Sequence, residues 1–331
     1  MPDDRRLTNR RRFLKSSAAV AGVAGIAGCQ DLMGEEEFPN RDVEIICPWA
    51  AGGGTDLTSR QFSNVGDPYL DDEVSYFVSN QTGGGGAAGF DAIRTADTDG
   101  HQIGIIANVL TIIPHFGLYE HTYEEFTGIM EYNVDPASIT VREDAPYDTI
   151  GEFVDYAEDN EVRMGTGGPG DIWHLAASGF ALEAGIEFTD VAFDGAAPAI
   201  QAVVADEIEA TAASVPEVAT QVLDGPLKIL ASQGENRHFM FPDTPTLMEE
   251  GYDWSMGVWR AIAGPADMDE EAVEVHHEVG QQVIEDNAFI DWMEENGFGV
   301  NYRGPDELDE YMAAEHEKFA QVIEEAGIEV E

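Results

Sequence analysis

Two glycine-rich segments could hold a small anion without any charged side chain. The first covers residues 50–56 (AAGGGTD) and the second covers residues 165–174 (GTGGPGDIWH). Each follows a predicted strand and precedes a predicted helix. Glycines permit sharp turns and close approach to the backbone, and a helix N-terminus offers unpaired N–H groups and a positive dipole end. This combination predicts an anion site that suits a carboxylate.

Neither segment is a standard phosphate motif. No Gly-Lys-Ser/Thr follows either one, which excludes a P-loop, and only the second contains a single G-x-G-x-x-G match, a weak signal. The structural alternative is that the glycines only make tight strand-to-helix turns. Two such loops on two predicted domains favour a shared ligand that contacts both. A third run, at residues 82–87, is interpreted as a structural turn.

The side chains beside these loops have alternative roles. Asp56 and Asp171 stand where helix caps belong, and capping is favoured over ligand contact. His174 either faces the ligand or is a buried, hydrogen-bonded histidine in a first helical turn. Trp49 and Trp259 either line a cleft or fill the core, and the core is favoured for Trp259.

Catalytic constellations are absent from the sequence. It contains no Gly-x-Ser-x-Gly elbow, no His-Glu-x-x-His and no cysteine–histidine metal spacing. The pair His276-His277 lies in a charged helical segment and is predicted to be on the surface. We therefore expect a binding protein and not an enzyme, with no metal and no cofactor.

The elements that must position these loops alternate between strands and helices. Amphipathic helices are predicted around residues 150–157 and 308–323. The alternation indicates an α/β architecture with mostly parallel sheets, in which ligands bind at the carboxyl ends of strands. The predicted strands cover residues 43–48, 75–79, 102–107, 138–141, 162–165, 189–193, 209–213, 227–231 and 258–263.

The composition restricts the possible partners. The chain has 331 residues, of which 65 are acidic and 16 basic, for a formal net charge of −49. A hydrophobic content of 43% excludes the usual disordered acidic chain, and the length favours two domains. The charge excludes a nucleic-acid groove and argues against an anionic membrane surface. Such self-repulsion requires screening by salt, so we expect a protein of an extreme halophile, with an unusually acidic mesophile protein as the alternative.

The N-terminus resembles an export signal. Residues 9–15 (NRRRFLK) form a twin-arginine pattern, and the apolar run 16–28 is too short to span a membrane. The run ends in a lipobox-like IAG before Cys29. We predict that residues 1–28 are a twin-arginine lipoprotein signal peptide, that Cys29 is lipidated, and that residues 29–38 are an acidic tether. The mature protein would then lie at the outer face of the cytoplasmic membrane.

Cleavage before Cys29 changes the charge and cysteine counts. It removes six of the 16 basic and two of the 65 acidic residues, which leaves 10 and 63 and a net charge of −53. Cys47 is then the single cysteine besides the lipidated one. We interpret it as a small buried apolar residue and not as a nucleophile or a disulfide partner.

A series of short motifs extends the argument beyond the two loops. They lie at residues 38–43, 47–56, 78–86, 99–103, 168–175, 193–199 and 241–246. In this order and spacing the chain resembles the extracytoplasmic solute receptors of tripartite tricarboxylate transporters, the Bug receptor family, in the form of a haloarchaeal-type lipoprotein. The resemblance extends over about residues 38–328.

The resemblance implies a fold and a function. The fold is the type 2 periplasmic-binding-protein fold, with two α/β domains, a double crossover and a ligand cleft between them. Domain I would take residues 39–138 and 248–331, and domain II residues 139–247. Such a receptor captures a di- or tricarboxylate or related organic acid by cleft closure and delivers it to a permease of large and small integral-membrane subunits. We expect a monomer. A receptor for a membrane signalling protein is the alternative, and an exported hydrolase is a third possibility.

The resemblance also nominates ligand-binding residues. The family holds the ligand's carboxylate with the two glycine loops, partly through water. Asp171 replaces the family's serine and Asp194 its lysine, and both add negative charge beside an anion site, which leaves the ligand open. The residues nominated in this way are Ala51, Gly52, Gly53, Thr55, Thr166, Gly167, Gly170, Asp171, Ile172, Asp194 and Gly195, and Trp49, Asn108 and His174 complete the list of nominated site residues.

Overall fold

A computed structural model describes residues 38–70, 74–168, 170–193 and 195–328. The predicted signal peptide, most of the predicted tether, the lipidation residue Cys29 and the candidate Asp194 therefore lie outside the described residues. Within the described ranges, no helix has the length and apolar character needed to cross a membrane.

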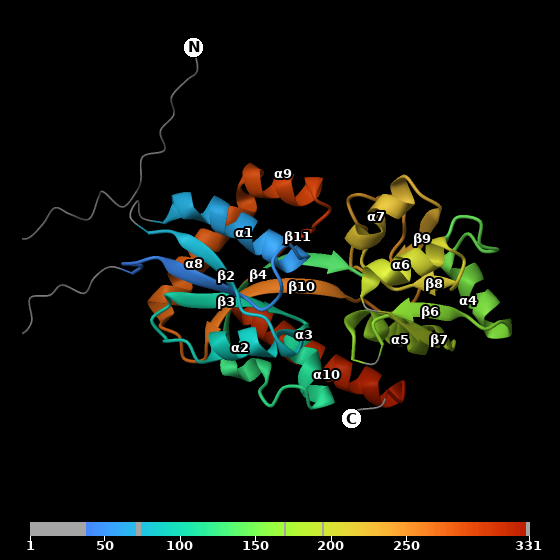
Figure 1. The fold of residues 1–331 in the computed structure, drawn as a ribbon, viewed down its shortest axis with the longest axis horizontal. Helices are drawn as coiled ribbons and strands as arrows, with labels where there is room; N and C mark the ends of the chain where they lie inside the picture. The colour runs from blue at the N-terminus through green and yellow to red at the C-terminus, as the bar shows by residue number, and fades with distance from the viewer. Residues whose placement is uncertain (1–37, 71–73, 169, 194, 329–331) are drawn as a thin grey trace, which may run out of the picture. The chain divides into compact units, whose positions relative to one another are not determined.

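The described chain alternates strands, α-helices and short 3-10 turns (Figure 1). The strands are β1 (Val43–Cys47), β2 (Tyr76–Asn80), β3 (Gln102–Ala107), β4 (Phe126–Pro136), β5 (Ser138–Arg142), β6 (Arg163–Thr166), β7 (Thr189–Ala192), β8 (Ala210–Thr211), β9 (Leu227–Ser232), β10 (Gly257–Pro265) and β11 (Val300–Arg303). The helices are α1 (Gly54–Gly66), α2 (Ala87–Arg94), α3 (Val109–Ile112), α4 (Ile150–Asp159), α5 (Ile172–Ala184), α6 (Ala196–Val204), α7 (Val215–Leu223), α8 (Glu270–Glu285), α9 (Asn287–Glu295) and α10 (Pro305–Glu325). The 3-10 turns are η2 (Asp67–Tyr69), η3 (Gly84–Gly86), η4 (Ile113–Phe116) and η5 (Tyr123–Glu125).

The strands form two sheets, in the orders β11-β4-β10-β3-β1-β2 and β7-β6-β8-β5-β9. The expectation of mostly parallel sheets is wrong, because both sheets are mixed. β1 runs parallel to β2 and β3, but β10 runs antiparallel to both β3 and β4. In the second sheet β6 runs parallel to its neighbours while β5 runs antiparallel to β8 and β9. The reason is the connectivity: the chain leaves the first sheet after β4 and re-enters it through β10, which must run in the returning direction.

Two of the described strands, β4 and β11, were not expected. β4 carries the polar residues Glu131, Asn133 and Asp135, which interrupt the apolar pattern that marks a strand. All three are buried. Glu131 forms an ion pair with Arg303 of β11, so the two missed strands stabilise one another through charges that a hydrophobic pattern does not register.

The first sheet is covered on both faces (Figure 1). Val43 and Ile45 of β1 pack in a cluster with residues of α1, α8 and α9, whereas Ile46 packs in another with residues of α2 and α10. This follows the period of two along a strand. Cys47 and Trp259 are fully buried, which confirms the predictions that the first is a buried apolar residue and the second belongs to the core.

The surface prediction for His276 is wrong. Its side chain is 1% exposed, and its ring nitrogens lie 2.8 Å from the Tyr76 hydroxyl and 2.9 Å from the Gly100 carbonyl oxygen. Burial lowers the pKa of His276 to about 4. The acidic neighbours in the sequence lie on other faces of α8, whereas His276 shares its face with Val279, Gly280 and Val283, which are buried.

Candidate functional site

The first glycine loop connects the carboxyl end of β1 to the N-terminus of α1. Gly52 adopts φ +86°, a left-handed conformation that favours glycine, and its N–H donates to the Asp56 carboxylate at 2.8 Å. Gly53 is the N-cap of α1 and supplies no side-chain cap. Ala51, Gly52 and Gly53 are exposed. The first N–H groups of a helix have no acceptor within it, so those of α1 remain available to a ligand.

Asp56 anchors this loop from within α1. Its side chain is buried and accepts from Arg60 Nε at 2.9 Å and Asn80 Nδ2 at 2.8 Å. Burial by itself would raise the pKa of Asp56, but hydrogen bonds from Arg60, the Gly52 N–H and Asn80 hold it below its usual value. The prediction that Asp56 caps the helix is wrong in position: it lies in the first turn, where its carboxylate fixes the preceding loop.

Arg260 supports the same loop from a distant part of the chain. It lies in β10, is 7% exposed, and donates from Nε to Thr55 Oγ1 at 3.0 Å. Its Nη1 forms an ion pair with the buried Asp135 of β4. Sequence reasoning missed this residue, although a lone arginine within the apolar run of 258–263 in a chain with so few cations was a usable signal.

The second glycine loop connects β6 to α5, and it is closed by its own side chains. Asp171 is the N-cap of α5 and accepts from Trp173 N–H at 2.9 Å and Gly167 N–H at 3.0 Å, which confirms the capping prediction. Thr166 Oγ1 accepts from Gly168 N–H at 2.9 Å and donates to Asp190. Burial raises the pKa of Asp171, and these backbone donors oppose that shift only in part.

His174 lies in the first turn of α5 and is 8% exposed. Burial lowers its pKa, although the carboxylates of Asp190 and Asp171 oppose the shift. The imidazole is therefore neutral near pH 7. Its Nδ1 has no hydrogen-bond partner among the described residues. His174 is thus buried, as the second of its two interpretations expected. Its Nδ1, however, makes no hydrogen bond with the described residues.

Three further candidates follow the carboxyl ends of strands β3, β7 and β1. Asn108 follows β3, is fully buried and donates from Nδ2 to the Gly257 carbonyl oxygen at 2.9 Å, while its Oδ1 has no partner in the described part of the chain. Gly195, exposed at φ +94°, is the N-cap of α6 after β7. Trp49 is half-buried after β1, and its ring meets the Phe90 ring edge-on at 5.7 Å.

No hydrogen bond or ion pair joins residues 50–56 to residues 165–174 in the ranges that the structure describes. Gly170 of the second loop lies beside η4, where an added Cβ would lie 3.5 Å from the Phe116 ring. Ile172 is half-buried at the start of α5.

The candidate residues lie where helices begin, after the carboxyl ends of parallel strands. β1 and β3 are parallel neighbours, and α1 and α3 begin at their carboxyl ends. β6 and β8 are likewise parallel neighbours, and α5 and α7 begin at theirs. Helix N-termini carry partial positive charge and free N–H groups. At the N-terminus of α1, which has no side-chain cap, this arrangement can bind an anion in a chain that has few cations, whereas Asp171 caps α5 and Ser214 and Glu217 cap α7. Among the described residues, no group of three His, Cys, Asp or Glu side chains could hold a metal ion.

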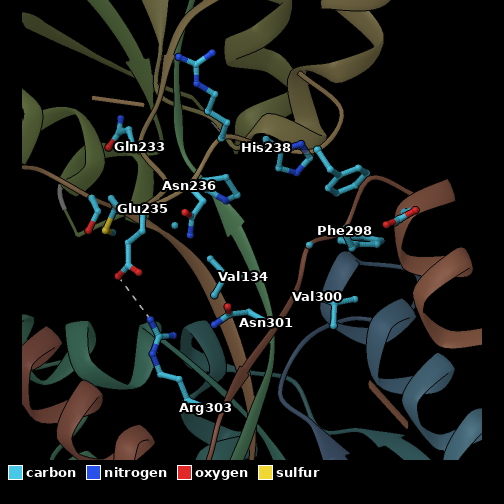
Figure 2. Close-up of a pocket in the computed structure, with 18 of the residues that line it drawn as sticks. Val134, Gln233, Glu235, Asn236, His238, Phe298, Val300, Asn301 and Arg303 are labelled. Atoms are coloured by element: carbon cyan, nitrogen blue, oxygen red, sulfur yellow. Dashed lines mark ion pairs between the residues drawn. The ribbon is translucent and has the colours of Figure 1, made fainter. Parts of the chain in front are cut away.

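A separate cavity of about 370 Å³ lies on the β11 side of the first sheet (Figure 2). It is lined by residues of β4 and β11, by the segment 233–239 and by residues 255–257. None of the nominated site residues lines it.

Comparisons with known proteins agree on one family. Residues 71–328 match the family model described as the tripartite tricarboxylate transporter family receptor. The crystal structure of a TctC solute-binding protein from Polaromonas, without ligand, is 34% identical, covers 87% of this chain and 99% of its own, and has a TM-score of 0.81.

Two further structures share the fold at lower identity. MatC from Rhodopseudomonas palustris with bound malate is 21% identical, covers 86% of this chain and 100% of its own, and has a TM-score of 0.70. An R. palustris protein with adipate is 20% identical, covers 88% of this chain and 99% of its own, and has a TM-score of 0.73.

Proposed function

The chain belongs to the tripartite tricarboxylate transporter receptor family, whose members are solute-binding receptors and not enzymes, and from this premise we propose that it captures a small di- or tricarboxylate. The observation that carries the proposal is the uncapped N-terminus of α1 behind the exposed Gly52 and Gly53. A ligand carboxylate placed there accepts from backbone N–H groups and needs no cationic side chain.

The ligand class draws support from relatives. MatC contains malate and the second R. palustris protein contains adipate. Both ligands carry two carboxylates on a short apolar or hydroxylated chain. We propose a ligand of this kind here, with one carboxylate on the first glycine loop and the N–H groups of Gly170 and Ile172 on the other side. Asp171 adds negative charge to that side, so we expect weaker contact there.

Capture requires movement between two lobes. We propose lobes formed by residues 39–138 with 248–331 and by residues 139–247. The six strands of the first sheet fall within the former and the five of the second within the latter, except that Ser138, the first residue of β5, belongs to the former range. The chain crosses between the sheets at Ala137, between β4 and β5, and again between β9 and β10. Rotation about these two crossovers would bring the loops together over the ligand.

The export, the membrane anchor and the partners of the receptor form a separate part of the proposal. We propose that the chain is exported by its twin-arginine signal and anchored by a lipid on Cys29. The receptor acts as a monomer and delivers its ligand to a permease of large and small membrane subunits. Its strong negative charge fits an extreme halophile. The alternative is a receptor that reports to a membrane sensor. Genes for the two permease subunits beside this gene would favour delivery, and a sensor gene in their place would favour signalling.

Calorimetry of the mature chain in molar salt tests the ligand class. The panel pairs malate, adipate, succinate and citrate with succinamide, which has the length of succinate but no charge. We expect saturable heat with at least one carboxylate and none with the diamide. A folded protein that binds none of the acids would contradict the proposal.

A further inference from the structure

The cavity on the β11 side lies between the two lobes proposed above. The segment 233–239 of the second lobe forms one wall, and residues of β4, α9, β11 and α10 in the first lobe form the other. Pro136 and residues 255–257, at the two crossovers, also belong to its lining. A change in the position of one lobe relative to the other must therefore change the width of this cavity.

The strand register places this cavity and the first glycine loop on opposite sides of the crossovers. Val300 of β11, in the cavity wall, pairs with Asn133 of β4. Asn133 also pairs with Arg260 of β10, which in turn pairs with Ala107 at the end of β3. Neighbouring strands lie about 4.8 Å apart, so this row separates Val300 from Ala107 by about 14 Å. The first glycine loop follows β1, one strand beyond β3, whereas the chain leaves and re-enters the sheet through β4 and β10, in the middle of the row.

Backbone hydrogen bonds join the two crossovers to one another. The Ala137 N–H donates to the Met256 carbonyl oxygen at 2.9 Å, and the Met256 N–H donates to the Gln233 carbonyl oxygen at 2.8 Å. The Gln233 N–H completes the ring by donating to the Ala137 carbonyl oxygen at 2.8 Å. The crossovers therefore form a single pivot. A rotation about this pivot that narrows the space on the β3 and β1 side must widen the cavity on the β11 side.

An ion pair crosses this cavity from one lobe to the other. Arg303 Nη2 lies 3.8 Å from Glu235 Oε1, and Figure 2 shows the two side chains facing one another. Arg303 is fixed within the first lobe by its ion pair with the buried Glu131 and by the Tyr311 ring, whose centroid lies 3.7 Å from Arg303 Cζ. Glu235 belongs to the second lobe and has no other ion pair in the described part of the chain. Arg303 therefore cannot follow Glu235 when the lobes rotate, and the distance between them must increase.

We propose that the Arg303–Glu235 ion pair is a conformational latch that holds the cavity on the β11 side narrow, favours the open form of the receptor and breaks when the glycine loops close over a carboxylate. This inference rests on the proposed function, since it requires the lobes to close on a ligand. The apparent affinity of a ligand rises in proportion to the population of the form that binds it. Weakening the latch therefore increases carboxylate affinity, whereas the loss of a contact with the ligand would decrease it.

Two charge changes at Glu235 test the latch, with malate, adipate, succinate and citrate titrated by calorimetry at one salt concentration. Both are made in a Glu294→Gln chain, because Glu294 also lines the cavity and would attract a new lysine. Glu235→Gln removes the attraction to Arg303, and Glu235→Lys replaces it by repulsion. We expect Glu235→Gln to bind about two- to fivefold more tightly, the range of an exposed ion pair, and Glu235→Lys to bind more tightly still.

Glu158, exposed on α4 of the second lobe, supplies the matched control. Glu158→Gln and Glu158→Lys in the same background make the same charge changes away from the cavity and should leave the affinity unchanged. Small-angle X-ray scattering adds a measurement without ligand: the radius of gyration of Glu235→Lys should be smaller than that of Glu158→Lys, because its lobes shift toward the closed form. A crystal structure with the bound acid should show Arg303 paired with Glu131 but no longer with Glu235.

Equal affinities in the Glu235 and Glu158 variants, or an Arg303–Glu235 pair that stays intact in the ligand-bound crystal, would overturn the latch. Weaker binding by Glu235→Lys than by Glu158→Lys would also contradict it, because the cavity would then narrow on closure. If the unmutated chain binds none of the acids, the scattering comparison still decides. A smaller radius of gyration in Glu235→Lys would in that case contradict the proposed function alone, and equal radii would contradict the latch as well.

Discussion

The two glycine loops have similar sequences, but the helix that follows has no side-chain cap at the first loop and a capping aspartate at the second. Each follows a strand of a parallel pair and leads into a helix of 13 residues. At the first loop, α1 begins at Gly54, and its N-cap Gly53 supplies no side-chain cap. At the second, Asp171 caps α5 and also takes the Gly167 N–H, so that the chain's own carboxylate occupies the position an anion would take.

The difference arises from where one aspartate falls relative to the helix start. Asp56 lies inside α1, where it is neutralised by Arg60 and fixes Gly52 from behind. Asp171 lies at the N-cap itself, where N–H groups point at it. Glycine content therefore marks a turn that can approach a ligand, but the position of the nearest acidic side chain decides whether the helix end stays open. The first loop should carry most of the affinity for a carboxylate.

The largest effect is expected on the free energy of unfolding, when Arg260, which also supports the first loop, loses its buried ion pair with Asp135. Arg260→Met removes the partner of Asp135, which is 2% exposed, and leaves a buried carboxylate without its counter-charge. We expect a loss of about 3–5 kcal/mol in the free energy of unfolding, measured by denaturant titration at fixed salt. Arg41→Met removes the exposed ion pair with Asp99 and should cost about 0–1 kcal/mol. Equal losses in the two variants would mean that the buried Arg260–Asp135 pair contributes no more to stability than an exposed pair does.

The second-largest effect is expected on ligand affinity, when a side chain is added to the exposed first loop. Gly53 has φ −76°, and an added Cβ would meet only the Ala50 carbonyl oxygen, at 3.4 Å. Gly53→Val is therefore tolerated by the fold, but its methyl groups stand where a carboxylate must approach. We expect at least a hundredfold loss of dicarboxylate affinity, about 2.7 kcal/mol, by calorimetry. Gly151→Val in α4, where an added Cβ meets nothing within 4 Å, is the control, and unchanged affinity in Gly53→Val would show that the first loop is structural.

The smallest effect is on how the free energy of unfolding depends on pH, and its sign should differ between Asp56 and Asp171. The pKa of Asp56 is lowered from its usual 3.8, so its contribution to stability is present above pH 3.8 and is lost as the pH falls. The pKa of Asp171 is raised from 3.8, so stability is lost as the pH rises through that raised value. Asp56→Asn and Asp171→Asn should therefore change the slope of unfolding free energy against pH in opposite directions.

Urea titrations at several values between about pH 3 and pH 6 measure these slopes. Asparagine caps a helix about as well as aspartate, so Asp171→Asn should keep α5 intact. The slope, and not the offset, is the quantity to compare. Slopes of the same sign would contradict the contrast between the loops.

Much of the fold was predictable because it depends on local pattern. The apolar runs of β1, β3 and β10 and the cap at Asp171 were each recognisable from neighbouring residues. β4 and β11 were not, because Glu131 and Arg303 satisfy one another from positions 172 residues apart. His276 was misplaced for a related reason: its partners, Tyr76 and Gly100, lie far away in the chain.

The sequence by itself determined the family, the two glycine turns and the need to bind an anion with few cations. The tertiary structure decided which turn stays open and which arginine supports it. These features depend on burial and on pairing between distant segments. Such pairing changes the free energy of a charge or an N–H group by several kcal/mol, and residue order alone does not reveal it.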